Sequence, residues 1–190
     1  MSSSESRERV LDVAEKLFST YGYATVKLKD IAKALGMRQA SLYYHAPGGK
    51  EELYLEVMRR NMQRHRQGLE EAIAQADDWQ SQLQAVAYWF LSQPPMDFTR
   101  MIHSDLRAVH PEHAQHLIHI TYEAVLQPIE QIFERCQAAG DIRAVDIKLL
   151  TGAFLSLIQA VHSVPQQWTN RSKEEMADEV LDILLHGLTA

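Results

Sequence analysis

A short stretch near the N-terminus combines side chains that can read nucleic-acid bases. Its polar and aromatic residues lie within eight positions of one another: Arg38, Gln39, Ser41, Tyr43, Tyr44 and His45. In the major groove of DNA, arginine suits guanine and glutamine suits adenine. Leu42 lies among these residues and would anchor the opposite face of a short helix to a core. The spacing favours nucleic-acid binding, and the alternative is an ordinary solvated surface helix.

The charge of the chain is divided unevenly along its length. The formal net charge of the 190 residues is -6, which by itself argues against a nucleic-acid-binding protein. Residues 1–66, however, hold 12 Lys and Arg against 8 Asp and Glu, whereas residues 67–190 hold 7 against 17. Since a basic surface attracts polyanions, we expect any contact with nucleic acid in the N-terminal third.

The periodicity of apolar residues predicts an all-α protein. No alternation of apolar and polar residues persists, so we expect no β-strand. One helix is expected to begin at a cap formed by Asp77 or Asp78 and to end before Pro94. The other helices are expected at about residues 6–20, 27–34, 38–45, 50–76, 97–109, 111–139, 145–164 and 172–188. Two short helices joined by a turn with Gly36, after a longer helix, form the frame of a helix-turn-helix.

Composition excludes several classes of protein. No apolar run approaches the roughly 18 residues of a membrane-spanning helix, and the N-terminus lacks the apolar core of a secretory signal. Cys136 is the one cysteine, so neither an intrachain disulfide nor a cysteine-based zinc site is expected. We therefore expect a cytoplasmic protein without a membrane partner, with one substantial core or with one small and one medium domain.

No pattern typical of catalysis is found. There is no Ser-His-Asp order, Gly-rich phosphate loop or set of metal ligands, so we expect neither an enzyme nor a cofactor. His110, His113, His116 and His119 recur every three residues, but each such step turns about -60° around a helix. A neighbouring pair at most could share an ion, whereas zinc requires four ligands, or three and a water. We predict no metal site and expect solvated or interface histidines.

Two helices near the C-terminus have apolar arcs that are too wide for one core. The 145–164 helix carries apolar residues over about half of its circumference, and the 172–188 helix has a similarly wide arc. One core cannot cover both sides of a terminal helix, so we predict a homodimer in which a second copy covers the rest. Deep burial within a monomer is the alternative. The predicted interface residues are Phe154, Leu157, Val161, Leu181, Leu184 and Leu188.

Polar residues on apolar helix faces indicate a second kind of site. Asp105 lies in the middle of the apolar face of the 97–109 helix, and Asn61 and His65 lie within that of the 50–76 helix. A buried carboxylate needs a partner or a pocket. These groups therefore either line a ligand cavity or form an internal pair, for example Asp105 with His65. The predicted ligand-binding residues are Asn61, His65, Trp89, Met101, Asp105 and Tyr122.

Several motifs of about the first 55 residues occur together and in a fixed order. They are Arg9-Val10-Leu11-Asp12-Val13-Ala14, Leu17-Phe18, Gly22-Tyr23, Asp30-Ile31-Ala32, Leu35-Gly36, Ser41-Leu42-Tyr43-Tyr44-His45 and Lys50-Glu51-Glu52-Leu53. In order and spacing they resemble the N-terminal domain of the TetR family of transcriptional regulators. The family usually opens the second helix with Thr or Ser, where this chain has Val26 and Lys27. We therefore expect Thr25 to cap this helix in place of a capping box with Asp30.

The resemblance implies a fold and roles for individual residues. The implied fold is a three-helix helix-turn-helix DNA-binding domain at residues 1–49 and a larger helical ligand-binding and dimerisation domain at residues 50–190. The implied DNA-contacting residues are Thr25, Lys27, Lys29, Arg38, Gln39, Ser41, Tyr43, Tyr44, His45 and Lys50. Lys50, at the start of the connecting helix, resembles the family's phosphate anchor. One of the two tyrosines, Tyr43 rather than Tyr44, could pack in the core instead.

The resemblance also implies a function, that of a ligand-responsive transcriptional regulator and usually a repressor. In this family a dimer occupies a palindromic DNA operator, and a small molecule in the larger domain changes the spacing of the two DNA-reading domains. That ligand must prefer the conformation that does not fit DNA. The alternatives are a helical binding or adaptor protein without specific DNA recognition, against which Arg38, Gln39 and Lys50 argue, and an enzyme.

Overall fold

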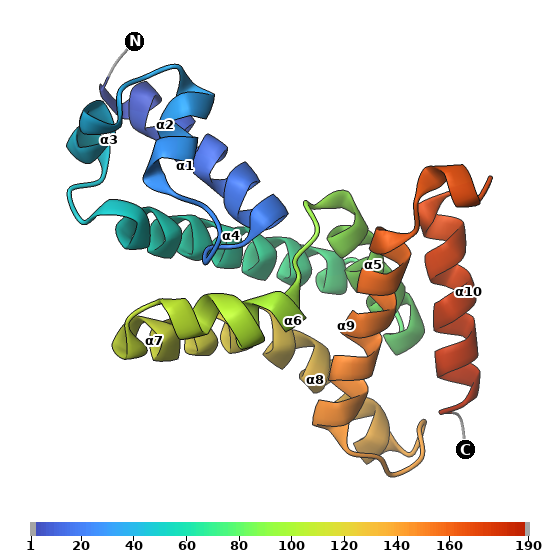
Figure 1. Ribbon diagram of the computed structural model, residues 1–190. Helices are drawn as coiled ribbons and strands as arrows, with labels where there is room; N and C mark the ends of the chain where they lie inside the picture. Colours follow the sequence, from blue (N-terminus) through green and yellow to red (C-terminus); the bar gives the residue numbers. More distant parts are fainter. Residues whose placement is uncertain (1–2, 189–190) are drawn as a thin grey trace. The chain divides into compact units, whose positions relative to one another are not determined.

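The computed structural model describes residues 3–188, which form helices joined by turns, with no β-strand in that range (Figure 1). The α-helices are α1 (Ser3–Tyr21), α2 (Leu28–Leu35), α3 (Gln39–His45), α4 (Gly49–Ala74), α5 (Trp79–Ser92), α6 (Phe98–Arg100), α7 (Pro111–Thr121), α8 (Gln127–Ala139), α9 (Ile147–Ser163) and α10 (Lys173–His186). The prediction of an all-α protein is confirmed. Of the helices described, none is long and apolar enough to cross a membrane.

The chain forms two compact units, each built from two separate stretches. The N-terminal unit comprises the residues up to Gln63 together with Asp97–Ile120, and the C-terminal unit comprises Arg64–Met96 together with the residues from Thr121 onward. Helix α4 contributes to both units. The functional boundary expected between residues 49 and 50 stays a prediction, because these units describe packing only.

An aromatic cluster organises the N-terminal unit. The most deeply buried residues of this unit include Val10, Leu11, Ala14, Ile31, Leu42 and Leu53. Next to them, the ring of Tyr54 lies 5.3 Å from that of Phe18 and 4.5 Å from that of Tyr23, measured between centroids. Burying each such side chain contributes about 1.5–3 kcal/mol. The cluster thereby fixes the C-terminal end of α1 against the first turns of α4.

The ends of α2 explain how the helix-turn-helix forms. Lys27 is the residue that precedes α2, and its backbone N–H donates to Asp30 Oδ2 at 2.9 Å. The expected cap at Thr25 is therefore wrong, because the Asp30 carboxylate satisfies an amide of the first turn instead. At the other end Gly36 adopts a φ of 68°, and its N–H donates to the carbonyl of Lys33. This left-handed residue ends α2 and turns the chain into α3.

Two helices that the sequence predicts as continuous are interrupted. In place of the predicted 97–109 helix, the chain forms the short helix α6, then a π turn at Met101–Asp105, then a 3₁₀ turn at Leu106–Ala108. The predicted 111–139 helix is divided into α7 and α8 by a π turn at Tyr122–Leu126. Arg100 and Asp105 are five residues apart, and the i→i+5 spacing of a π turn brings them to the same side. In the second case Pro128 lacks the N–H that a regular helix would use.

The C-terminal unit packs α10 against α5 and α9, and α8 against the same two helices (Figure 1). The rings of Phe133 on α8 and Phe154 on α9 meet almost perpendicularly, with centroids 6.1 Å apart. The expected cap before α5 is confirmed, since Asp78 accepts the N–H of Ser81 at 2.8 Å. Such a cap contributes about 1 kcal/mol.

Candidate nucleic-acid interface and buried polar groups

Helix α3 presents a polar surface while one residue holds it in place. Leu42 is fully buried, and the exposed residues of and next to α3 include Arg38, Gln39 and Ser41. Tyr43 and Tyr44 are exposed by 47% and 77%, so the expectation that one of them packs in the core is wrong. The helix has only seven residues, and Leu42 occupies its inner face. Both tyrosines are therefore free to meet a partner.

The remaining candidate DNA-contacting residues differ in how exposed their side chains are. Thr25, Lys27 and Lys29 are exposed at the start of α2. His45 is half-buried, and its Nε2 lies 3.3 Å from the hydroxyl of Ser6 on α1. The four residues lie around the same helix-turn-helix as α3, and their roles in binding stay predictions.

Lys50 is already engaged within the chain. Its ammonium donates to the backbone carbonyl of Tyr23 at 2.9 Å and lies 4.0 Å from the centre of the Tyr23 ring. Burial lowers the pKa of Lys50. The carbonyl of Tyr23 takes one of the three N–H donors of this ammonium, and a contact between Lys50 and phosphate, which stays a prediction, would use another.

Asp105 is paired within the N-terminal unit. Its side chain is almost fully buried; Oδ1 accepts the N–H of Ala24 at 3.2 Å, and Oδ2 lies 3.7 Å from the Arg100 guanidinium. Arg100 in turn donates to the carbonyl of Ser19 at 2.6 Å, at the end of α1. A Cβ at Gly22 would lie 3.0 Å from both Arg100 Cδ and Asp105 Oδ1. The expected pair of Asp105 with His65 is wrong, because an arginine and a backbone amide compensate this carboxylate.

His65 forms part of an aromatic contact in the C-terminal unit. Its Nδ1 accepts the indole N–H of Trp89 at 3.2 Å, and its ring stacks on Phe90 with centroids 5.2 Å apart. Burial lowers the pKa of His65 to about 4, so this imidazole is neutral at pH 7. Gly68 makes room for the contact, since a Cβ there would lie 2.2 Å from the Trp89 ring. His65 and Trp89 thus pack against each other, and their predicted role in ligand binding stays a prediction.

The six predicted ligand-binding residues are divided between the two units. Asn61, Met101 and Asp105 belong to the N-terminal unit, and His65, Trp89 and Tyr122 belong to the C-terminal unit. Sequence reasoning missed Glu130 on α8, which is only 6% exposed and accepts the hydroxyl of Tyr122 at 2.8 Å. The signal that could have found it is Pro128, which indicates a change of helical register before Glu130.

The predicted dimer interface is in large part core. Phe154, Val161, Leu181 and Leu188 are buried within the single chain and cannot themselves form a contact surface, which corrects their assignment. Leu157 and Leu184 are partly exposed. These two line an apolar groove of about 320 Å³ together with Arg143, Val180, Ile183, Gly187 and the edge of Leu188. An outward-facing apolar groove therefore remains, formed mainly by α10 together with Leu157 of α9.

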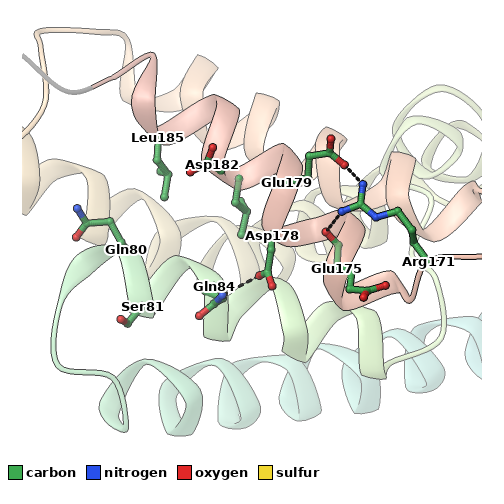
Figure 2. Close-up of a pocket in the computed structure, with 10 residues that line it drawn as sticks. Gln80, Ser81, Gln84, Arg171, Glu175, Asp178, Glu179, Asp182 and Leu185 are labelled. Atoms are coloured by element: carbon green, nitrogen blue, oxygen red, sulfur yellow. Dashed lines mark hydrogen bonds and ion pairs between the residues drawn. The ribbon is translucent and has the colours of Figure 1, made fainter.

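Two further grooves are lined by many polar side chains, some of which pair with each other. The groove of about 670 Å³ between α5 and α10 is drawn in Figure 2, where Gln84 donates to Asp178 and Arg171 pairs with Glu179. A second groove, of about 700 Å³, lies beside the start of α4. There Glu51 accepts the N–H of His110 at 3.0 Å. No group of three or more His, Cys, Asp or Glu among the described residues could hold a metal ion.

Comparison with known proteins supports the N-terminal motifs. A family model described as bacterial regulatory proteins, tetR family, matches residues 10–57. The HTH-type transcriptional regulator LmrA of Bacillus subtilis (strain 168) is 38% identical over 85 residues, which are 45% of this chain and 45% of LmrA. The match to this curated relative thus spans less than half of its length.

Solved structures share the fold over almost the whole chain. A regulatory protein of the tetR family from Rhodococcus RHA1 matches with a TM-score of 0.78 at 20% sequence identity. The match covers 100% of this chain and 99% of the Rhodococcus protein. AibR, solved with isovaleryl coenzyme A and operator DNA, has a TM-score of 0.77 at 19% identity over 94% of this chain and 97% of its own. A transcriptional regulator from Saccharomonospora viridis, solved with choline, has a TM-score of 0.68 at 25% identity over 98% and 99%.

Proposed function

We propose that this chain is a member of the TetR family of bacterial regulatory proteins, that it binds a DNA operator in the cytoplasm, and that it responds to a small molecule. The family model and the curated relative describe regulators, which are not enzymes. The observation that carries the proposal is the surface of α3. Arg38, Gln39 and Tyr44 are exposed there, while Leu42 and the glycine turn before α3 fix the helix.

We propose that the regulator is a homodimer and that its operator is palindromic. The support is the apolar groove on α9 and α10, where Ile183 is 68% exposed beside Leu157 and Leu184. A second copy of the same surface would cover these side chains. Two recognition helices related by twofold symmetry then read two half-sites of inverted sequence.

We further propose that the protein is a repressor released by an effector in the C-terminal unit. The motif resemblance supports this mechanism, in which the effector stabilises a conformation that does not fit DNA. Isovaleryl coenzyme A and choline, bound by two proteins of the same fold, are chemically unlike. The fold therefore leaves the class of effector open, and only the residues of this chain can narrow it.

The DNA proposal is tested by selecting genomic fragments that bind the protein and measuring the affinity against salt. Gln39→Ala should relax the preference at one base pair of each half-site, at about 1–3 kcal/mol. Lys50→Ala should weaken binding to all sequences alike and reduce the log-log salt slope by about one unit. An unchanged selected site for Gln39→Ala would show that the register of α3 is wrong. Absence of salt-sensitive binding in the wild type would favour an adaptor protein.

The dimer proposal is tested by sedimentation. Ile183→Glu should give monomers with weaker operator binding, because a charge at the centre of the groove opposes its burial and single half-sites bind weakly. Ile118→Glu is the matched control, since Ile118 is 54% exposed, lies on α7 and does not line this groove. A wild-type protein that sediments as a monomer at micromolar concentration would contradict the proposal.

A further inference from the structure

Two carboxylates are buried among the described residues, and they differ in what surrounds them. Asp105 and Glu130 are 4% and 6% exposed. Asp105 has the guanidinium of Arg100 and the N–H of Ala24 as partners. Glu130 has one partner, the hydroxyl of Tyr122, and in the described part of the chain no basic side chain lies within ion-pair distance of it. Its charge is therefore left without a counter-ion.

The position of Glu130 follows from the π turn that precedes α8. Tyr122 and Glu130 are eight residues apart, which would leave them about 80° apart around a regular helix. The π turn at Tyr122–Leu126 accommodates one extra residue, so the pair comes to lie about two full turns apart on one side. The regular helix is thus interrupted at Tyr122, the residue that donates its hydroxyl to Glu130. Such π turns frequently occur at functional sites.

The surroundings of the pair are negative and incompletely hydrogen-bonded. The hydrogen bond to Glu130 raises the pKa of Tyr122, and the charge of Glu134, one turn further along α8, acts in the same direction. The hydroxyl of Thr121, next to Tyr122, is buried and has no hydrogen-bond partner. Tyr122 itself is half-buried, so the pair is not sealed on that side.

A carboxylate held away from water is unfavourable unless a cation compensates it. We infer that Glu130, presented with Tyr122, is the effector-recognition carboxylate of the C-terminal unit, and that the effector carries a positively charged nitrogen. Such a group would pair with Glu130 and could lie against the face of the Tyr122 ring. This inference rests on the proposed function, and it supplies the class of effector that the fold leaves open.

The test compares an ammonium ion with its neutral carbon isostere, by calorimetry on the full chain at pH 7.5. The probes are choline and tetraethylammonium, with 3,3-dimethylbutan-1-ol as the uncharged counterpart of choline. In the wild type at least one ammonium ion should bind at least about tenfold more tightly than the alcohol. Glu130→Gln should weaken ammonium binding by about thirtyfold or more, since it removes one partner of a buried charge pair, and should leave the alcohol unaffected.

Control variants separate charge recognition from folding. Glu134→Gln removes an exposed carboxylate from the same helix and should change ammonium binding by less than about threefold. Glu130→Asp keeps the charge and should retain a preference for ammonium. If Glu130→Gln fails to fold, the wild-type comparison of ammonium with the alcohol still decides, because equal binding of the two overturns the inference. Equal binding of ammonium and alcohol, no binding of either ammonium ion, or a preference that survives in Glu130→Gln would overturn the inference.

Operator binding without any probe distinguishes this inference from the function on which it rests. Glu130→Gln should bind the selected operator as the wild type does. If the wild type binds operator but shows no ammonium preference, the inference fails and the proposed regulator stands. If the wild type binds no operator, the proposed function itself fails.

Discussion

The two units of this protein each bury one carboxylate, but only the N-terminal unit neutralises it. Asp105 is held by Arg100 and by the amide of Ala24, whereas Glu130 in the C-terminal unit has only a tyrosine hydroxyl. A compensated carboxylate fixes the elements that it joins, which here are the turn after α1 and the segment from α6 onward. An uncompensated one retains the capacity to bind a cation. By this difference we distinguish Asp105, which positions elements of the fold, from Glu130, which we infer to recognise a ligand.

The two units also differ in the kinds of polar group that they contain. In the N-terminal unit, charged side chains of α1 and α4 pair with each other, as Arg7 does with Glu56 and Arg60 with Asp12. In the C-terminal unit the buried polar groups include neutral His65 and Thr151, whose hydroxyl has no hydrogen-bond partner. Buried polar atoms without a hydrogen-bond partner occur in both units, since Arg60 Nη1 and Arg100 Nε of the N-terminal unit are among them. The ion pairs between α1 and α4 are therefore what distinguishes the N-terminal unit.

Asp105→Ala should have the largest effect on stability. It leaves the partly buried Arg100 guanidinium and the Ala24 amide without their acceptor, at about 3–4 kcal/mol. Thermal unfolding and amide exchange of residues 18–26 measure this loss. Asp77→Ala, which removes an exposed carboxylate, is the control and should change the free energy of unfolding by less than about 0.5 kcal/mol. Equal losses in the two variants would show that Asp105 is not a structural partner.

Acid should destabilise the C-terminal unit first, through His65. Its pKa is about 4 when folded and about 6.5 when unfolded, so the unfolded state binds the proton more readily between these values. The free energy of unfolding should therefore fall by about 3 kcal/mol as the pH drops from 6.5 to 4. In the N-terminal unit the hydrogen bond to His113 lowers the pKa of Glu51, so its contribution persists to lower pH.

Denaturant unfolding at several pH values measures this difference. His65→Phe removes the titrating group while keeping a ring against Phe90, and should flatten the dependence on pH. His116→Gln, which changes an exposed histidine, should leave the dependence intact. A pH profile unchanged in His65→Phe would contradict the assignment.

Gly22→Ala should have an intermediate effect, because it disturbs the contact of Asp105 without removing a charge. Gly22 has a φ of 79°, and a Cβ there would approach both Arg100 and Asp105 to 3.0 Å. Gly36→Ala is the matched control, since its φ is 68° but nothing lies within 4 Å of its Cβ. We expect a loss of about 2 kcal/mol for Gly22→Ala and about 1 kcal/mol for Gly36→Ala. Melting temperatures of the two variants give the difference, and equal values would count against a tight contact.

Glu130→Gln should have the smallest effect on stability. It removes an uncompensated charge and keeps the hydrogen-bonding shape toward Tyr122, so the free energy of unfolding should change by less than about 1 kcal/mol. The comparison with Asp105 is made in chemical denaturation without any ligand. A loss as large as that of Asp105→Ala would mean that Glu130 has a structural partner, and the contrast between the two units would fail.

Local patterns predicted much of the fold because they act over a few residues. Helical periodicity gave most of the α-helices to within a few residues but not the interruptions at Met101–Asp105 and Tyr122–Leu126. Gly36 marked the turn, and Leu42 was the expected anchor of α3. The charge excess and the motifs of the first third indicated the DNA-binding domain. Each of these features depends on the residue type and its immediate neighbours.

Only the tertiary structure decided what each buried polar group does. The sequence placed Asp105 and His65 on apolar faces but did not reveal their partners. Asp105 pairs with Arg100 and with the amide of Ala24, and His65 accepts a hydrogen bond from Trp89. The sequence also predicted Phe154 and Leu181 at a surface, although the neighbouring helices cover them. The sequence pattern of a carboxylate on an apolar helix face is the same whether or not folding brings a cation close to it. Its role depends on charges brought close by folding, and for that reason Glu130 and not Asp105 is the candidate for effector recognition.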